Sequence, residues 1–109
     1  DGYFNYDGFD YLVEARWRKS PPSIQDLSGF KDKVTRRLQS TRGLFVSMAD
    51  FRQEVVTEFA SGTKNVILMS GHDLTLIVEG MIELRHGLDA KIERAVRHGE
   101  ILFYLKDLL

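Results

Sequence analysis

The chain has 109 residues, 43% hydrophobic and 28% charged, which is enough for one compact domain and too short for two. The net charge of −1 excludes a globally basic nucleic-acid-binding protein, so any DNA contact needs a local basic region. The lack of cysteine excludes disulfides, thiolate chemistry and cysteine-ligated zinc. No apolar run approaches the roughly 20 residues of a membrane span. We therefore expect a cytoplasmic protein with no membrane partner.

Residues 1–17 predict a β-hairpin that turns at Asp7-Gly8. This pair favours a type I′ turn, because both central residues of that turn need a positive φ. A two-residue turn places Asp1 opposite Glu14, with Cβ atoms about 4.5–5.5 Å apart. Two carboxylates so close repel each other unless a cation lies between them. Because side chains alternate along a strand, Arg16 shares the face of Glu14, and we expect an acid, acid, base cluster there.

Helical and strand patterns alternate after the hairpin. A helix is predicted over 24–38, with Ser23 as its N-cap and Asp26 as the acid of its first turn. The apolar runs 43–46 and 66–69 predict strands buried on both faces, and they should be parallel because a helix joins them. The other predicted elements are a helix over 50–60, helical periods over 74–81 and 88–96, and a final strand over 100–105.

The hairpin cluster resembles the active site of the PD-(D/E)XK nuclease superfamily, in its restriction-endonuclease-like members. Asp1-Gly2 is similar to the Asp-Gly of that family, and residues 11–17 are similar to its apolar strand ending in Glu-x-Lys, with Arg16 in the lysine position. The resemblance implies an α/β fold with a restriction-endonuclease-like core. In that core, a mixed sheet of four to five strands, an antiparallel hairpin plus a parallel βαβ unit, is flanked by helices. The resemblance continues through residues 43–47, 66–69, 72–74 and 99–101 and covers nearly the whole chain.

The resemblance also guides the expected domain organisation. Residues 1–109 would be a single nuclease domain. The family usually has a helix before its first strand, and the sequence opens inside the predicted hairpin at Asp1. We therefore expect a fragment of a larger protein, whose additional domains would be partners of this one.

A metal site is implied at the end of the hairpin. Asp1 and Glu14 would be anionic ligands of Mg²⁺, with Mn²⁺ as a substitute, and the family implies a third ligand from the backbone carbonyl of Ala15. Asp1, Glu14 and Arg16 are the expected catalytic residues. Arginine keeps the positive charge of the family's lysine and can grip a phosphate, but it cannot act as a base at neutral pH.

A basic region between positions 16 and 42 supplies the candidate DNA contacts. Phosphate contacts by such residues give salt-dependent, sequence-independent affinity. The alternative to DNA contact is a structural role, in which the basic helix residues form a solvated face and Arg16 forms an ion pair with Glu14 or Asp10. The candidate DNA-binding residues are Arg18, Lys19, Lys31 and Lys33, and Lys19, Lys31 or Lys33 is also a candidate to replace the motif lysine.

The sequence is compatible with three functions. The first is metal-dependent hydrolysis of DNA phosphodiester bonds, as the endonuclease effector of a larger protein. The second is a catalytically impaired nuclease-fold domain used for DNA binding or self-association; homodimers that cut two strands are common in the family. The third is a small-ligand sensor built on Ser47 and residues 70–73. The aromatic residues of the hairpin, Trp17 included, are expected to pack in the core or across strands rather than to stack on bases.

Overall fold

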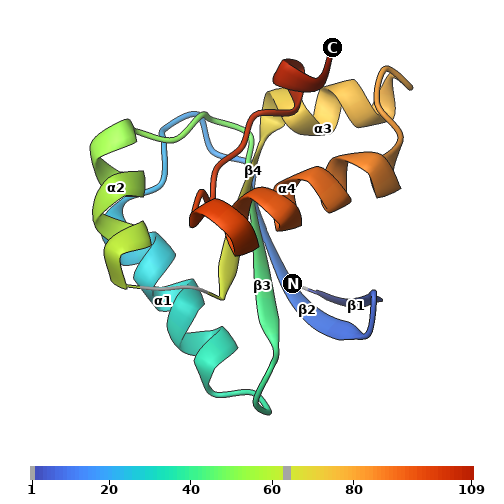
Figure 1. The fold of residues 1–109 in the computed structure, drawn as a ribbon. Helices are drawn as coiled ribbons and strands as arrows, with labels where there is room; N and C mark the ends of the chain where they lie inside the picture. The colour runs from blue at the N-terminus through green and yellow to red at the C-terminus, as the bar shows by residue number, and fades with distance from the viewer. Residues whose placement is uncertain (1, 63–64) are drawn as a thin grey trace.

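The computed structural model describes residues 2–62 and 65–109, which form a four-stranded mixed sheet between two layers of helices (Figure 1). The strands lie in the order β1-β2-β3-β4, with β1 antiparallel to β2 and the other neighbours parallel. This topology confirms the predicted α/β class, the antiparallel hairpin and the parallel βαβ unit. The strands are β1 Gly2–Tyr6, β2 Phe9–Arg16, β3 Arg42–Ser47 and β4 Val66–Ser70.

The hairpin has the predicted turn and register. Asp7 and Gly8 adopt φ values of 56° and 87°, as a type I′ turn requires. Gly2 pairs with Val13, so the register is the one that the turn predicts. The predicted pairing of Asp1 with Glu14 lies outside the described residues.

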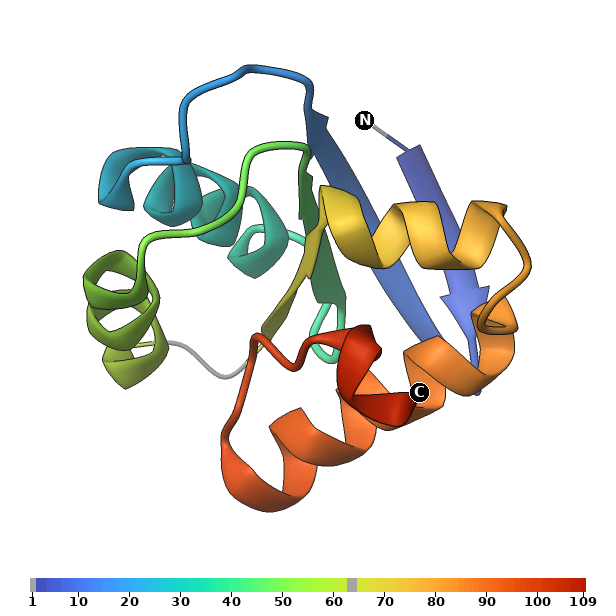
Figure 2. The ribbon, with the colours of Figure 1, turned by 90° about the horizontal axis from the view of Figure 1, so that it is seen from above.

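Helices cover both faces of the sheet (Figure 2). On one face, α1 (Ile24–Thr35) and α2 (Gln53–Gly62) pack on a core that includes Phe45 and Leu68. On the other, α3 (Gly71–Val78) and α4 (Leu84–His98) pack against Leu44 and Ile67. Because neighbouring residues of β3 and β4 point to opposite cores, both strands are buried on both faces, as predicted. Within the described ranges, no helix has the length and apolar character needed to cross a membrane.

Helix α1 lies close to the sheet because of its cap and of a glycine beneath it. Ser23 and Asp26 form the predicted capping box, in which each side chain accepts a hydrogen bond from the backbone N–H of the other. A Cβ atom on Gly43 would lie 2.7 Å from both Phe30 Cε2 and Val34 Cγ2, so only glycine allows this approach without a shift of the helix. Gly43 thus lets the second half of α1 approach the sheet, while the ion pair of Asp26 with Arg16 joins its first turn to the end of β2.

Two predicted helices have different bounds in the structure. The helix predicted over 24–38 ends at Thr35, since the chain must turn back to enter β3, and Leu38 in that turn is 89% exposed. The helix predicted over 50–60 begins at Gln53, because the Asp50 carboxylate accepts hydrogen bonds from Phe51 N and Tyr104 Oη before the helix starts. These differences leave the order of elements unchanged.

The predicted final strand over 100–105 is wrong. Only one backbone bond from β4 reaches this segment, from Leu68 N to Ile101 O at 2.9 Å, and the chain then turns into a short 3₁₀ helix, η1 (Leu105–Leu108). Side chains bind two other backbone groups of the segment: Lys91 donates to the Phe103 carbonyl, and Asp73 accepts from Leu105 N. A fifth strand therefore does not form.

A buried ion pair ties this C-terminal segment to the sheet. Lys91 of α4 and Asp73 of α3 are 1% and 0% exposed, and Lys91 Nζ lies 2.9 Å from Asp73 Oδ2. Lys91 also donates to the carbonyls of Leu68 at 2.9 Å and of Phe103 at 2.6 Å. Burial lowers the pKa of Lys91, although the Asp73 carboxylate opposes that change. The pair connects α3, α4, β4 and the segment before η1.

Candidate metal and nucleic-acid site

Glu14 is the central residue of the candidate site. It lies near the carboxyl end of β2 and is 7% exposed. Leu12, two residues earlier on the same face, packs into the core beneath α1. Because strand side chains alternate, Glu14 and Arg16 follow on this face, where Arg16 meets the first turn of α1 and Glu14 meets its last turn. A carboxylate so deeply placed needs cationic or hydrogen-bonding partners.

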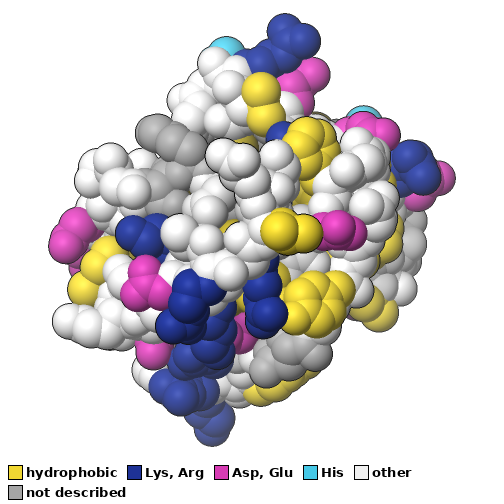
Figure 3. Space-filling model, turned by 90° about the horizontal axis from the view of Figure 1, so that it is seen from below, with side chains coloured by type: hydrophobic (Ala, Val, Ile, Leu, Met, Phe, Trp, Pro, Cys, Tyr) yellow, Lys and Arg dark blue, Asp and Glu magenta, His cyan; other side chains and the backbone are white. Residues whose placement is uncertain are grey.

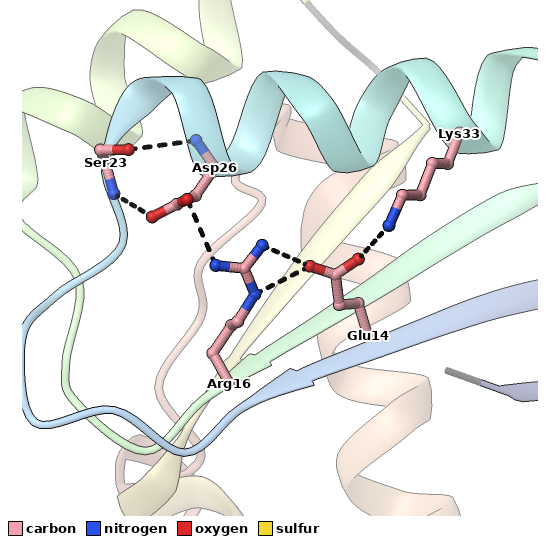
Figure 4. Close-up of polar contacts among 5 residues, drawn as sticks. All are labelled: Glu14, Arg16, Ser23, Asp26 and Lys33. Atoms are coloured by element: carbon pink, nitrogen blue, oxygen red, sulfur yellow. Dashed lines mark hydrogen bonds and ion pairs between the residues drawn. The ribbon is translucent and has the colours of Figure 1, made fainter.

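Both oxygens of the Glu14 carboxylate are bound by cations (Figure 4). Arg16 contacts Glu14 Oε2 through Nε at 2.9 Å and through a terminal guanidinium nitrogen at 2.8 Å. Lys33 Nζ lies 3.1 Å from Glu14 Oε1. The second terminal nitrogen of Arg16 lies 3.2 Å from Asp26 Oδ1. The site is therefore a chain of alternating charges that links β2 to two turns of α1.

These charges keep the acids of the site ionised. Burial opposes ionisation of Glu14, but its hydrogen bonds and charge interactions with Lys33 and Arg16 outweigh that effect and lower its pKa. The pKa of Asp26 is lowered chiefly by the backbone hydrogen bond from Ser23, with Arg16 adding to the effect. The pKa of Arg16 is raised by Glu14 and Asp26 despite its burial. At neutral pH the site presents an anionic carboxylate between two cations.

This arrangement predicts an acid-sensitive site. The pKa of Glu14 in the folded chain lies below its ordinary value of 4.5, so the stabilisation from its ion pairs is complete above that value and is lost as the pH falls through the lowered pKa. We expect Lys33→Met to raise the pKa of Glu14, so that the loss begins at a higher pH. Titration of ¹³C-labelled glutamate carboxyls by NMR measures this change. Lys31→Met is the matched control, and a Glu14 pKa that is unchanged in Lys33→Met would contradict the ion pair.

The structure shows which of the candidate basic residues contact Glu14, a distinction that the sequence does not make. Arg16 pairs with Glu14, whereas Asp10 instead accepts a hydrogen bond from Asn5. Among the three candidate lysines, Lys33 is the one that contacts Glu14. The other expected DNA-binding residues are placed outside this contact: Arg18 and Lys19 are exposed beyond the end of β2, and Lys31 is half-buried on α1.

Asp26 is a member of the site that sequence reasoning did not include. Its signal is visible as the acid of the capping box, but the pattern gives no reason for a second contact. One of its oxygens caps α1 and the other binds Arg16. Asp26 therefore fixes the position of the Arg16 guanidinium relative to the helix.

A groove opens beside Glu14. It has a volume of about 400 Å³, and Tyr3, Glu14, Lys33 and Arg37 are among its lining residues. Arg37 also lines a neighbouring groove with Arg42. Figure 3 shows lysine and arginine side chains gathered in a band on the face seen from below, with a few acids beside them. Lys33, Arg37 and Arg42, which belong to the basic region that the sequence predicts, thus line two grooves of a chain that is close to neutral overall.

Glu14 and Ala15 are the expected metal ligands that lie within the described residues. Glu14 provides the hard anionic oxygen that Mg²⁺ prefers, and Ala15, which follows it, lies in the ladder opposite Val46. Asp1, the expected second acidic ligand, lies outside the described residues. Among residues 2–62 and 65–109, no group of three or more His, Asp or Glu side chains is placed to hold a metal ion. Among the expected acidic ligands, the described residues thus supply Glu14 alone, and its two carboxylate oxygens are bound by Arg16 and Lys33.

The residues expected for a ligand sensor have internal roles. Ser70 and Asp73 form the capping box of α3, and Asp73 also binds Lys91. Ser47 donates its hydroxyl hydrogen to the Ala49 carbonyl. His72 is exposed on the first turn of α3. Ser47, Ser70 and Asp73 thus serve the ends of the parallel strands, while Ser70 and His72 also line a groove of about 350 Å³ with Asp50, Tyr104 and Lys106.

Comparison with known proteins places the fold. No family model and no curated protein matches the chain. Among solved structures, the chain is similar to the MspJI restriction endonuclease in complex with a 27-mer oligonucleotide, with a TM-score of 0.50 and 20% sequence identity. The match covers 88% of this chain and 22% of that protein, so the chain spans about a fifth of its length. With its mixed four-stranded sheet between two helical layers, this chain has a restriction-endonuclease-like fold.

Proposed function

We propose that this domain hydrolyses phosphodiester bonds of DNA with a divalent metal ion held at Glu14. The observation that carries the proposal is the buried Glu14 carboxylate, which lies at the end of β2 in a restriction-endonuclease-like fold and contacts both a lysine and an arginine. The similar solved protein is a restriction endonuclease bound to an oligonucleotide, which supports DNA as the partner. The basic band beside the groove suits a polyanionic substrate.

Each residue of the site has a role in this proposal. Asp1, Glu14 and the Ala15 carbonyl would hold Mg²⁺, with Mn²⁺ as a substitute. When bound, the ion would neutralise charge on the phosphate and lower the pKa of a bound water. Lys33, whose ammonium already contacts Glu14, replaces the motif lysine and stabilises the charge that develops on the phosphate. Arg16 grips a phosphate oxygen with its planar guanidinium.

Supercoiled plasmid is the substrate that tests the proposal. The chain is incubated with the plasmid in Mg²⁺, in Mn²⁺, in Ca²⁺ or in EDTA, and nicked and linear products are measured over time. We expect products in Mg²⁺ and Mn²⁺ and none in EDTA. Equal cleavage in EDTA would reveal a contaminating or metal-independent activity and would refute the proposal.

One observation favours the second candidate function, a domain that binds DNA without cutting it. Arg16 stands in the lysine position of the motif, and together with Lys33 it already neutralises Glu14. A carboxylate satisfied in this way has less to gain from a metal ion. This candidate predicts salt-sensitive DNA binding with no cleavage in any metal.

Arg16→Lys distinguishes the two candidates. A shorter point charge at this position restores the Glu-x-Lys pattern and frees one of the two hydrogen bonds to Glu14 Oε2. If the natural chain is impaired by its arginine, we expect metal-dependent nicking to appear in the variant. If Lys33 already serves as the catalytic lysine, the natural chain cleaves and the variant changes the rate by less than about tenfold. Filter binding at two salt concentrations provides the control for DNA affinity.

A further inference from the structure

Trp17 is the most unusual side chain near the candidate site. The sequence predicts that it packs in the core or across the hairpin, and the structure contradicts this, because Trp17 is 70% exposed. The reason is that β2 ends at Arg16, so Trp17 lies one residue beyond the strand and is not covered by the sheet. An exposed indole leaves a large apolar surface in water, and tryptophan is enriched at interfaces because its ring is apolar and its N–H can still form a hydrogen bond.

The backbone next to Trp17 is fixed. Arg16 O accepts a hydrogen bond from Met48 N at 3.0 Å, which continues the pairing of β2 with β3 past its last strand residue. The Arg16 side chain is held by both Glu14 and Asp26. Trp17 therefore projects from a rigid strand end, about 10 Å along the chain from Glu14 at the usual rise of about 3.3 Å per residue.

The positively charged residues next to Trp17 in the sequence favour the binding of a polyanion. Arg16 precedes it, and the exposed Arg18 and Lys19 follow it. By contrast, the exposed ring of Tyr3 on β1 already has the Arg37 guanidinium 5.5 Å from its centroid. None of the aromatic or cation–ring contacts found in the described ranges involves Trp17. Its ring face is thus available, while its neighbours can hold phosphates.

We propose that Trp17 is a stacking platform for an unpaired nucleobase of a DNA strand whose phosphates are held by Arg18 and Lys19. Proteins that bind single strands combine a positively charged path for the backbone with aromatic rings on which bases stack. This inference rests on the proposed function in that DNA is the partner of this domain. It adds that the strand beside Glu14 is unpaired where it meets the end of β2.

The sole tryptophan of the chain makes the test direct, because all tryptophan emission comes from Trp17. The 109-residue chain is titrated in EDTA with a 12-nucleotide oligothymidylate while emission is recorded. The control ligand is an abasic oligomer of the same length, which carries the phosphates but no bases. We expect saturable quenching by oligothymidylate and little quenching by the abasic oligomer. Equal quenching by both ligands, or none by either, would overturn the stacking site.

Variants complete the test by fluorescence anisotropy of a labelled oligonucleotide. Trp17→Ala should weaken binding of oligothymidylate by about tenfold, whereas Trp17→Phe should retain most of the affinity because it keeps an aromatic face. Val78→Ala, which shortens another exposed apolar side chain, is the matched control. Circular dichroism checks that each variant is folded. Unchanged affinity in Trp17→Ala would overturn the proposal.

The outcomes also separate this inference from the proposed function, since the titrations contain no metal. Quenching by oligothymidylate without plasmid cleavage in Mg²⁺ or Mn²⁺ would refute the nuclease and leave the stacking site in place. Cleavage without quenching would do the reverse.

Discussion

Replacing Glu14 with glutamine is expected to slow metal-dependent DNA cleavage by about 100- to 1,000-fold. Glutamine has nearly the same shape but carries no charge, so it cannot serve as the anionic metal ligand or pair with Lys33 and Arg16. The loss should appear in the single-turnover rate of plasmid nicking at saturating protein. DNA affinity should be retained or increased, because the change removes a negative charge beside the basic band.

Glu58→Gln is the matched control for this variant. Glu58 is an exposed acid on α2, so its replacement makes the same chemical change on another element. We expect it to cleave at the rate of the natural chain. Equal rates for Glu14→Gln and the natural chain would exclude Glu14 from the catalytic site, whichever residue holds the metal.

Replacing Lys91 with methionine is expected to lower the free energy of unfolding by about 3–5 kcal/mol. Methionine matches the length of lysine but leaves the Asp73 carboxylate buried with no cationic partner. It also leaves the Leu68 and Phe103 carbonyls without their donor. The attachment of the C-terminal segment to β4 should weaken together with global stability. Urea unfolding followed by far-ultraviolet circular dichroism measures the change.

A double variant and an exposed lysine provide the controls for Lys91. Adding Asp73→Asn to Lys91→Met removes the unpaired charge, so the double variant should be less destabilised than the sum of the two single variants. Lys106→Met, on the exposed η1, should change stability by less than about 0.5 kcal/mol. A Lys91→Met variant as stable as the Lys106→Met variant would show that the buried pair contributes no net stability.

Local chemistry made the hairpin and the helix cap predictable from the sequence. The Asp7-Gly8 turn sets the pairing of β1 with β2, and alternation along β2 places Glu14 and Arg16 on one face. The capping box of Ser23 and Asp26 needs only four consecutive residues. In each case, atoms close in sequence determine the geometry.

Long-range contacts were not predictable in the same way. Periodicity cannot choose between Lys31 and Lys33, because the choice depends on how α1 is rotated over the sheet. The contact of Asp26 with Arg16 depends on the path of the loop through Pro21 and Pro22. The exposure of Trp17 follows from where β2 stops, which alternation along the strand does not reveal.

The prediction of a final strand was wrong for a related reason. Alternation over 100–105 is compatible with a strand, but it does not show that Lys91 and Asp73 bind the backbone of this segment. Asp73 is 32 residues from Leu105 and Lys91 is 12 residues from Phe103, so the pattern within the segment cannot reveal either contact. The order of the earlier elements was predictable because short loops between them leave few alternative topologies.

The two borders of the sheet differ in how they would meet another polypeptide. Along β4, the segment whose Ile101 carbonyl accepts a hydrogen bond from Leu68 N covers the middle of the strand, so another strand cannot pair there. Along β1, the described residues pair on the β2 side alone, so the opposite row of amides and carbonyls faces outward. An additional strand is therefore expected to pair with β1, at the hairpin end of the molecule. Such pairing would serve either a specific partner or the first step of aggregation.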